Sequence, residues 1–292
     1  MLRLLTAELF KLYKNKTFKI LCIVSIFLGI FTLIMTSSVM DKILTSSMEG
    51  MSQEEAAQVM EQLSSSSEGQ VITPGSMGVQ IVAKDPLNPT TMEIFHSSFG
   101  AGLTEVLLGI FVAGFLAKEY SSKTIKNALS YGKKRYEFYI SKFLVMIIGI
   151  AIILLALTVI PTVGHAITNG WGEAFKGEQI LDILRTYGAT LLTNASVVAI
   201  MMVIAILIRS NGGTIGATIG IFTLLPMLIS FLYGKNDTFD TIYEITPFYT
   251  NRISMFIYAT GGDIGKAVII ALITIIIFLF IGVNIFKKQD IN

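Results

Sequence analysis

Few residues of this chain have the types and spacings that chemistry requires. Its two histidines, His96 and His165, each lie near one end of an apolar stretch, where a polar side-chain tip is more common than a metal ligand. The single cysteine, Cys22, lies inside another apolar stretch, which leaves no disulfide and no cysteine-based metal site. The sequence contains no HExxH, no GxSxG and no G-x-x-x-x-G-K-[ST] phosphate loop. We therefore expect no catalytic, metal-binding or cofactor-binding residue here, and no enzyme.

Glu105 is the ionisable residue best placed to act inside a membrane. It lies in the apolar stretch 92–117, about 20 Å along a helix that starts at Met92. Small residues share its helical face at spacings of three and four: Ser98, Gly102, Gly109 and Ala113. An ionisable group at such a depth is a functional candidate, so we predict a pathway or gate at Glu105, Gly102 and Gly109. The open alternative is a protonated or hydrogen-bonded glutamate that holds two helices together.

The segment from Lys118 to Lys142 is basic and rich in Ser and Tyr, although long apolar runs flank it. It contains seven of the 22 Lys and Arg residues. A segment of this kind between two membrane spans lies in water, and its charge predicts the cytoplasmic side. There it can contact a soluble partner, unless it is an ordinary basic loop.

The composition of the elements around these residues is that of a membrane protein. Hydrophobic residues make up 53% of the chain and charged residues only 14%. Because about 20 apolar residues cross a bilayer core of ~30 Å, the sequence predicts an all-α polytopic protein with residues 1–292 in one transmembrane domain. Six spans are expected at about 18–38, 92–117, 139–161, 181–208, 214–233 and 264–286.

The N-terminal residues 2–16 predict an amphipathic helix in the inner membrane interface. Leu2, Leu5, Leu9 and Leu12 recur at spacings of three and four, and basic residues lie nearby. The mixed polarity before the first apolar run is unlike a secretory signal. The alternative is a plain cytoplasmic extension of the first span.

Basic residues also predict the orientation. With the N-terminus inside, most of the 22 Lys and Arg residues lie on the cytoplasmic side, so both termini are expected there. The outer loop 39–91 is expected to connect spans, with a short helix after a capping box from Ser52 to Glu55. A second short helix is expected around Pro247.

Span 214–233 carries two further signals. Gly212, Gly216 and Gly220 repeat every four residues and predict a face on which another helix packs closely. Pro226 is expected to kink the same span.

The order of the residues after Lys118 is more specific evidence of function than the positive charge of the segment. Glu119 and Tyr120 are followed by a threonine, a basic position and a leucine, and then by an arginine and a lysine that open the next span. With six spans, both ends inside and an amphipathic helix before span 1, the sequence resembles the ABC-2 type permease family, the membrane subunits of bacterial ABC exporters. Segments 209–212 and 286–290 are similar to the family's short loop and tail. Lys123 departs from the family, which usually has glycine there.

The resemblance implies a coupling helix at about 119–130, in the cytoplasmic coupling loop 118–138, that docks on a separate cytoplasmic ABC ATPase. It implies that ATP is bound by this partner, that a second permease copy or a paralogue completes the pathway in the bilayer, and that no nucleic acid is involved. The implied ATPase-coupling residues are Glu119, Tyr120, Lys123, Thr124, Lys126, Asn127, Leu129 and Arg135.

The expected function is therefore that of an exporter permease in the bacterial plasma membrane, which moves a peptide, an amphipathic molecule or an ion outward. Family members of similar size often export antimicrobial peptides, other amphipathic molecules or ions. An ATP-independent ion channel or secondary carrier is one alternative, but polar residues at mid-membrane depth are scarce. A membrane sensor or scaffold is the other.

Overall fold

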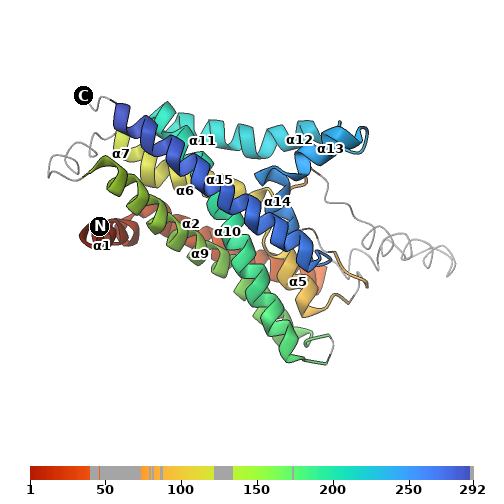
Figure 1. Cartoon of the computed structure of the whole chain (residues 1–292). Helices are drawn as coiled ribbons and strands as arrows, with labels where there is room; N and C mark the ends of the chain where they lie inside the picture. The colour runs from red at the N-terminus through yellow and green to blue at the C-terminus, as the bar shows by residue number, and fades with distance from the viewer. Residues whose placement is uncertain are drawn as a thin grey trace.

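The structure, a computed structural model, describes residues 1–39, 46, 74–78, 80, 82–85, 88–121, 134–172 and 174–289 (Figure 1). The regular structure of these residues is helical, and their β contacts are limited to one isolated bridge between Gly78 and Ala101. Among the described residues, five helical segments are long and apolar enough to cross a membrane: Lys16–Ser37, Arg135–Thr168, Gly177–Ile208, Asn211–Ile229 and Gly261–Lys288. The all-α, multi-pass class predicted from the sequence is confirmed.

The long elements are α1 (Leu2–Lys14), α2 (Lys16–Ile34), α9 (Arg135–Thr168), α10 (Gly177–Ile208) and α15 (Gly261–Lys288). A helix interrupted by a π-helical turn is formed by α11 (Asn211–Ile219), η3 (Gly220–Leu224) and α12 (Leu225–Ile229). The shorter elements are η1 (Met35–Val39), α5 (Thr91–Ser97), α6 (Leu103–Val112), η2 (Ala113–Ala117), α7 (Lys118–Ser121), α13 (Asp237–Glu244) and α14 (Pro247–Ile253). The helix expected around Pro247 is α14, whereas the one expected after Ser52 lies outside the described residues.

Both chain termini and α7 lie at one end of the bundle, and α5, α13 and α14 lie toward the other (Figure 1). The basic segment that follows α7 therefore starts at the same end as the two termini. Glu119 and Tyr120 of α7, two of the residues implied in coupling, therefore lie at this end of the bundle.

The N-terminal segment forms α1, which Asn15 separates from α2. The Asn15 side chain accepts a hydrogen bond from the Phe18 amide and so caps the start of α2. On α1, Leu12 is buried and Leu5 and Leu9 pack against the core, but Leu2 is exposed. A helix with one packed face is thus present, and its position in the membrane interface stays a prediction.

The single span predicted over 92–117 is divided in the structure. Helix α5 ends at Ser97 and α6 begins at Leu103, because Gly100 and Gly102 adopt the left-handed φ values of 62° and 77° that glycine tolerates. Ser98 therefore does not share a helical face with Glu105. The break instead places Glu105 in the first turn of α6, where the helix dipole favours negative charge.

In the segment Asn211–Ile229, Pro226 lies beside an irregular helical turn, whereas the glycines form an open face. The π-helical turn Gly220–Leu224 ends two residues before Pro226, which lacks the N–H that a regular α-helix requires. At Gly212, Gly216 and Gly220, an added Cβ would meet no atom within 4 Å among the described residues. The face predicted for close packing is therefore open in the single chain.

Gly282 of α15 lies directly against Tyr139 of α9, and a Cβ there would overlap the Tyr139 hydroxyl and ring. We expect Gly282→Ala to lower the free energy of unfolding by about 1–2 kcal/mol, because the two helices must move apart. Denaturant unfolding in detergent measures the change. Gly265→Ala on the same helix is the matched control, because its Cβ would enter open space; it should leave stability unchanged or slightly higher. Equal effects of the two substitutions would contradict this account of the contact.

Candidate coupling site

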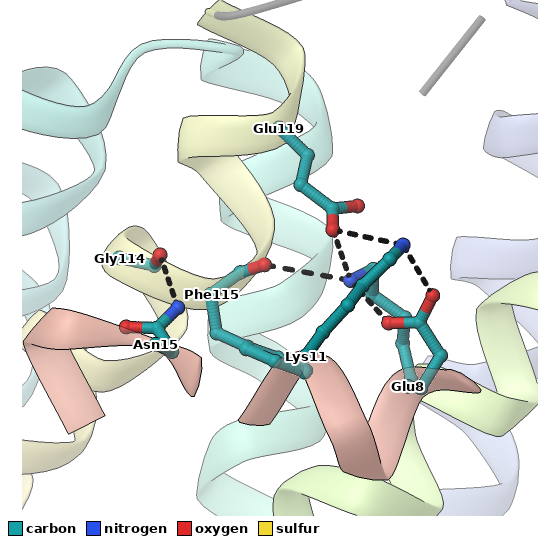
Figure 2. Close-up of polar contacts among 7 residues, drawn as sticks. Glu8, Lys11, Asn15, Gly114, Phe115 and Glu119 are labelled. Atoms are coloured by element: carbon teal, nitrogen blue, oxygen red, sulfur yellow. Dashed lines mark hydrogen bonds and ion pairs between the residues drawn. The ribbon is translucent and has the colours of Figure 1, made fainter. Parts of the chain in front are cut away.

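Four charged side chains meet where α1, α7 and α9 come together; we call Glu8, Lys11, Glu119 and Lys142 the charge cluster. Lys142 Nζ lies 2.7 Å from Glu8 Oε2 and 2.9 Å from Glu119 Oε1. Lys11 Nζ lies 2.6 Å from Glu8 Oε1 and 3.2 Å from Glu119 Oε1. Figure 2 shows the Glu8, Lys11 and Glu119 side chains converging from α1 and α7. Each carboxylate is thus shared by two ammonium groups.

Burial makes this pairing obligatory. Lys142 is fully buried, and Glu8 exposes 1% of its surface. The Lys142 ammonium also lies 3.5 Å from the Phe115 carbonyl oxygen and 4.2 Å from the Phe115 ring centroid. A buried charge without partners costs several kcal/mol, whereas two acids and two bases together carry no net charge. The cluster therefore holds three elements in one arrangement.

Lys11 is the partly exposed member of the cluster. Burial lowers the pKa of its ammonium, but the carboxylates of Glu119 and Glu8 raise it more, so that the pKa lies above its ordinary value. Lys11 therefore remains protonated at neutral pH and keeps both carboxylates paired.

The junction of α1 and α2 is held to η2 beside the cluster. The Asn15 amide donates a 3.2 Å hydrogen bond to the Gly114 carbonyl oxygen (Figure 2). A Cβ at Gly114 would lie 2.6 Å from Thr17 Cγ2, so only glycine permits this approach. The start of α2 is therefore packed directly against η2.

Tyr120 connects α7 to the end of α15. Its hydroxyl donates a 3.1 Å hydrogen bond to Gln289 Oε1, and the Gln289 amide donates to the Ile206 carbonyl oxygen of α10. Burial raises the pKa of Tyr120, so the phenol stays protonated as a donor. Its ring also contacts Phe286 edge-on.

Arg135 contacts the last carbonyl groups of α15. One guanidinium nitrogen donates to the carbonyl oxygens of Phe286, Lys287 and Gln289 at 3.3, 2.9 and 2.7 Å. These acceptors carry the negative end of the helix dipole, which a fixed cation stabilises. In the described structure Arg135 thus joins the start of α9 to the end of α15.

Glu105 belongs to a second polar network, which joins α6, α10 and α14. The Asn251 side-chain amide donates a 3.0 Å hydrogen bond to Glu105 Oε1, and the Thr193 hydroxyl donates a 2.9 Å bond to Asn251 Oδ1. Thr193 also lies 3.0 Å from the Ser254 hydroxyl. All four side chains are buried, so these bonds are those expected of a glutamate that holds helices together.

The other two residues predicted for the gate have structural contacts. Gly109 faces Thr218 of α11 closely enough that a Cβ would lie 2.5 Å from its hydroxyl oxygen. Gly102 forms the turn before α6, and a Cβ there would lie 2.8 Å from Met77 Cγ. The structure brings neither glycine to an open passage within the described residues, and their role in a gate stays a prediction.

Among the residues implied in coupling, the structure places Glu119, Tyr120 and Arg135 at this site. The remainder of the set lies outside the described residues: Lys123, Thr124, Lys126, Asn127 and Leu129. Sequence reasoning missed Glu8 as a site residue, although it lies four residues from both Leu4 and Leu12 on the packed face of α1.

Comparison with known families decides the identity. The sequence model described as ABC-2 family transporter protein matches residues 8–291. The chain belongs to the ABC-2 transporter family. The resemblance inferred from the sequence is confirmed, and the chain is the membrane permease component of an ABC transporter rather than its catalytic component. No curated protein matches this ABC-2 permease closely enough to add to that assignment.

Within the permease, Arg135→Ala is expected to lower the free energy of unfolding by about 1–2 kcal/mol, because carbonyl groups at the end of α15 lose a charged donor. Thermal unfolding in detergent measures the change. Lys288→Ala is the control, since this exposed lysine lies on the same last turn. If Arg135→Lys retains full stability, the several bonds from one guanidinium are not what matters.

Proposed function

We propose that this chain is the permease subunit of an ATP-driven exporter and that a cytoplasmic ABC ATPase docks on the loop 118–138. The observation that carries the proposal is the charge cluster. It joins Glu119, at the start of the loop, to Lys142, just beyond its end, and both to α1. Movement of a docked ATPase would therefore reach α1, η2 and α9 together.

The proposed topology has six crossings with both termini in the cytoplasm of a bacterial cell. Five apolar helices supply five crossings, and the divided segment from α5 to η2 supplies the sixth. Two termini at one end of the bundle require an even number of crossings (Figure 1). The positive charge at that end favours the cytoplasm, with α1 in the inner interface.

A second permease copy or a paralogue is proposed to pack on the open glycine face of α11 and η3. Small residues at this spacing let two helix backbones approach closely in a membrane. The face is unoccupied by the described residues of the single chain, which supports an intermolecular role. The pathway for a peptide, an amphipathic molecule or an ion would then lie between the two copies.

Co-purification and reconstitution test the proposal. The chain is expressed with the ABC ATPase that we expect to be encoded by a neighbouring gene, isolated through a tag on the permease, and placed in liposomes. We expect ATP hydrolysis that depends on both subunits, and cargo movement that stops when the ATPase carries a substitution of its phosphate-loop lysine. Cargo movement without ATP or without the partner would contradict the exporter proposal and favour a channel or secondary carrier. ATPase binding without any cargo movement would favour a sensor.

A further inference from the structure

A cavity of about 430 Å³ lies at the junction of α1 and α2, beside α7. We call it the elbow cavity. Its lining includes the exposed lysines Lys14, Lys16 and Lys118, together with Phe10 and the charge-cluster residue Lys11. Its volume falls within the range of roughly 300–1,000 Å³ that is typical of small-molecule sites.

The charge of the elbow cavity is strongly positive. In the adjacent charge cluster, the ammonium groups of Lys11 and Lys142 already balance the two carboxylates. Lys14 and Lys16 therefore add positive charge that this cluster does not neutralise. A cavity lined in this way favours an anionic ligand.

The surface beside the cavity indicates what kind of anion fits. Lys16 opens a face of α2 on which Ile20, Ile23 and Phe27 follow at spacings of four, three and four. These three side chains expose 58%, 66% and 65% of their surface. Inorganic phosphate has no apolar part that could contact this stripe. A phospholipid can place its headgroup at the lysines and its acyl chains along the stripe.

We propose that the elbow cavity binds the phosphate-bearing headgroup of an anionic phospholipid whose acyl chains lie along the exposed face of α2. The bound headgroup lies beside Lys11 and Glu119, two members of the charge cluster. The lipid would thus be a structural partner of the coupling site. The inference rests on the proposed position of α1 at the membrane interface and is independent of any ATPase.

Native mass spectrometry of the full chain in detergent tests the site. The probes are phosphatidylglycerol and phosphatidylcholine with identical acyl chains, and inorganic phosphate is the soluble competitor. Because each lysine near a membrane surface contributes about fivefold to anion binding, we expect at least tenfold tighter retention of phosphatidylglycerol. The Lys14→Gln/Lys16→Gln double variant should lose this preference, and Lys16→Gln alone should lose about fivefold of it. Lys287→Gln/Lys288→Gln is the matched control, because it removes two lysines from the last turn of α15, outside the cavity lining.

Each outcome decides the proposal. Retention of the preference in the control and its loss in the double variant, with both variants eluting as single folded species, supports it. Equal retention of the two lipids by the unsubstituted chain overturns it, as does an equal effect of the two double substitutions. Displacement of the lipid by millimolar inorganic phosphate would show a site for a soluble anion and would also overturn it. Because no ATPase is present, failure here leaves the exporter proposal untouched.

Discussion

Replacing Lys142 with methionine is expected to lower the free energy of unfolding by about 3–5 kcal/mol, the largest effect of any single substitution considered for this permease. The change removes the Lys142 ammonium from both carboxylates, of which the buried Glu8 carboxylate then keeps only its ion pair with Lys11. Denaturant unfolding in detergent measures the loss. Lys134→Met is the matched control, because this exposed lysine directly precedes α9; its effect should stay within about 0.5 kcal/mol.

A second substitution separates charge balance from packing. Adding Glu8→Gln to Lys142→Met removes one charge of each sign, so at least half of the lost stability should return. If the double variant is no more stable than Lys142→Met, the loss comes from packing and not from unpaired charge. In liposomes with the ATPase, the double variant should hydrolyse ATP but move cargo poorly, since α1 and α9 are no longer joined through Glu8. Normal cargo movement per ATP would show that the charge cluster contributes to stability and not to coupling.

Glu105→Ala is expected to lower the free energy of unfolding by about 2–3 kcal/mol. The substitution leaves the buried Asn251 amide without its acceptor and creates a cavity beside α14. Glu105→Gln keeps an oxygen in the acceptor position, so its stability should lie within about 1 kcal/mol of the unsubstituted chain. Unfolding midpoints and cargo movement per folded molecule are measured for both variants.

The glutamine variant decides between the two interpretations of Glu105. The hydrogen bond from Asn251 favours the role of holding helices together, so we expect cargo movement per folded molecule to be unchanged in Glu105→Gln. A tenfold fall in cargo movement at unchanged stability would instead show that the ionisable group itself serves a pathway or gate.

Local patterns in the sequence were sufficient to predict the long helices and the family. Apolar runs of spanning length predicted the five long helical segments, because crossing a bilayer imposes both length and composition. The break before Glu105 was missed because Gly102 also fits the small-residue face of a continuous helix, and only the positive φ values of Gly100 and Gly102 distinguish a turn. Two glycines separated by one residue, followed by a threonine and a glutamate, are a helix-start signal that the length of an apolar run does not reveal.

The charge cluster could not be predicted in the same way. Glu8 and Lys142 lie far apart in the sequence, and their 2.7 Å contact depends on how α1 packs on α9. A glutamate on an otherwise apolar helical face indicates a buried partner without saying which one. Arg135 shows the converse, because its place in a family pattern suggested a partner outside the chain, whereas its contacts here are to the end of α15.

The 2.9 Å contact between Glu119 and Lys142 has a mechanical consequence. It joins the two helices from which the basic segment departs and to which it returns. A force applied anywhere between these residues cannot separate them unless a buried ion pair breaks. A load on the segment would therefore act on the ends of both helices together.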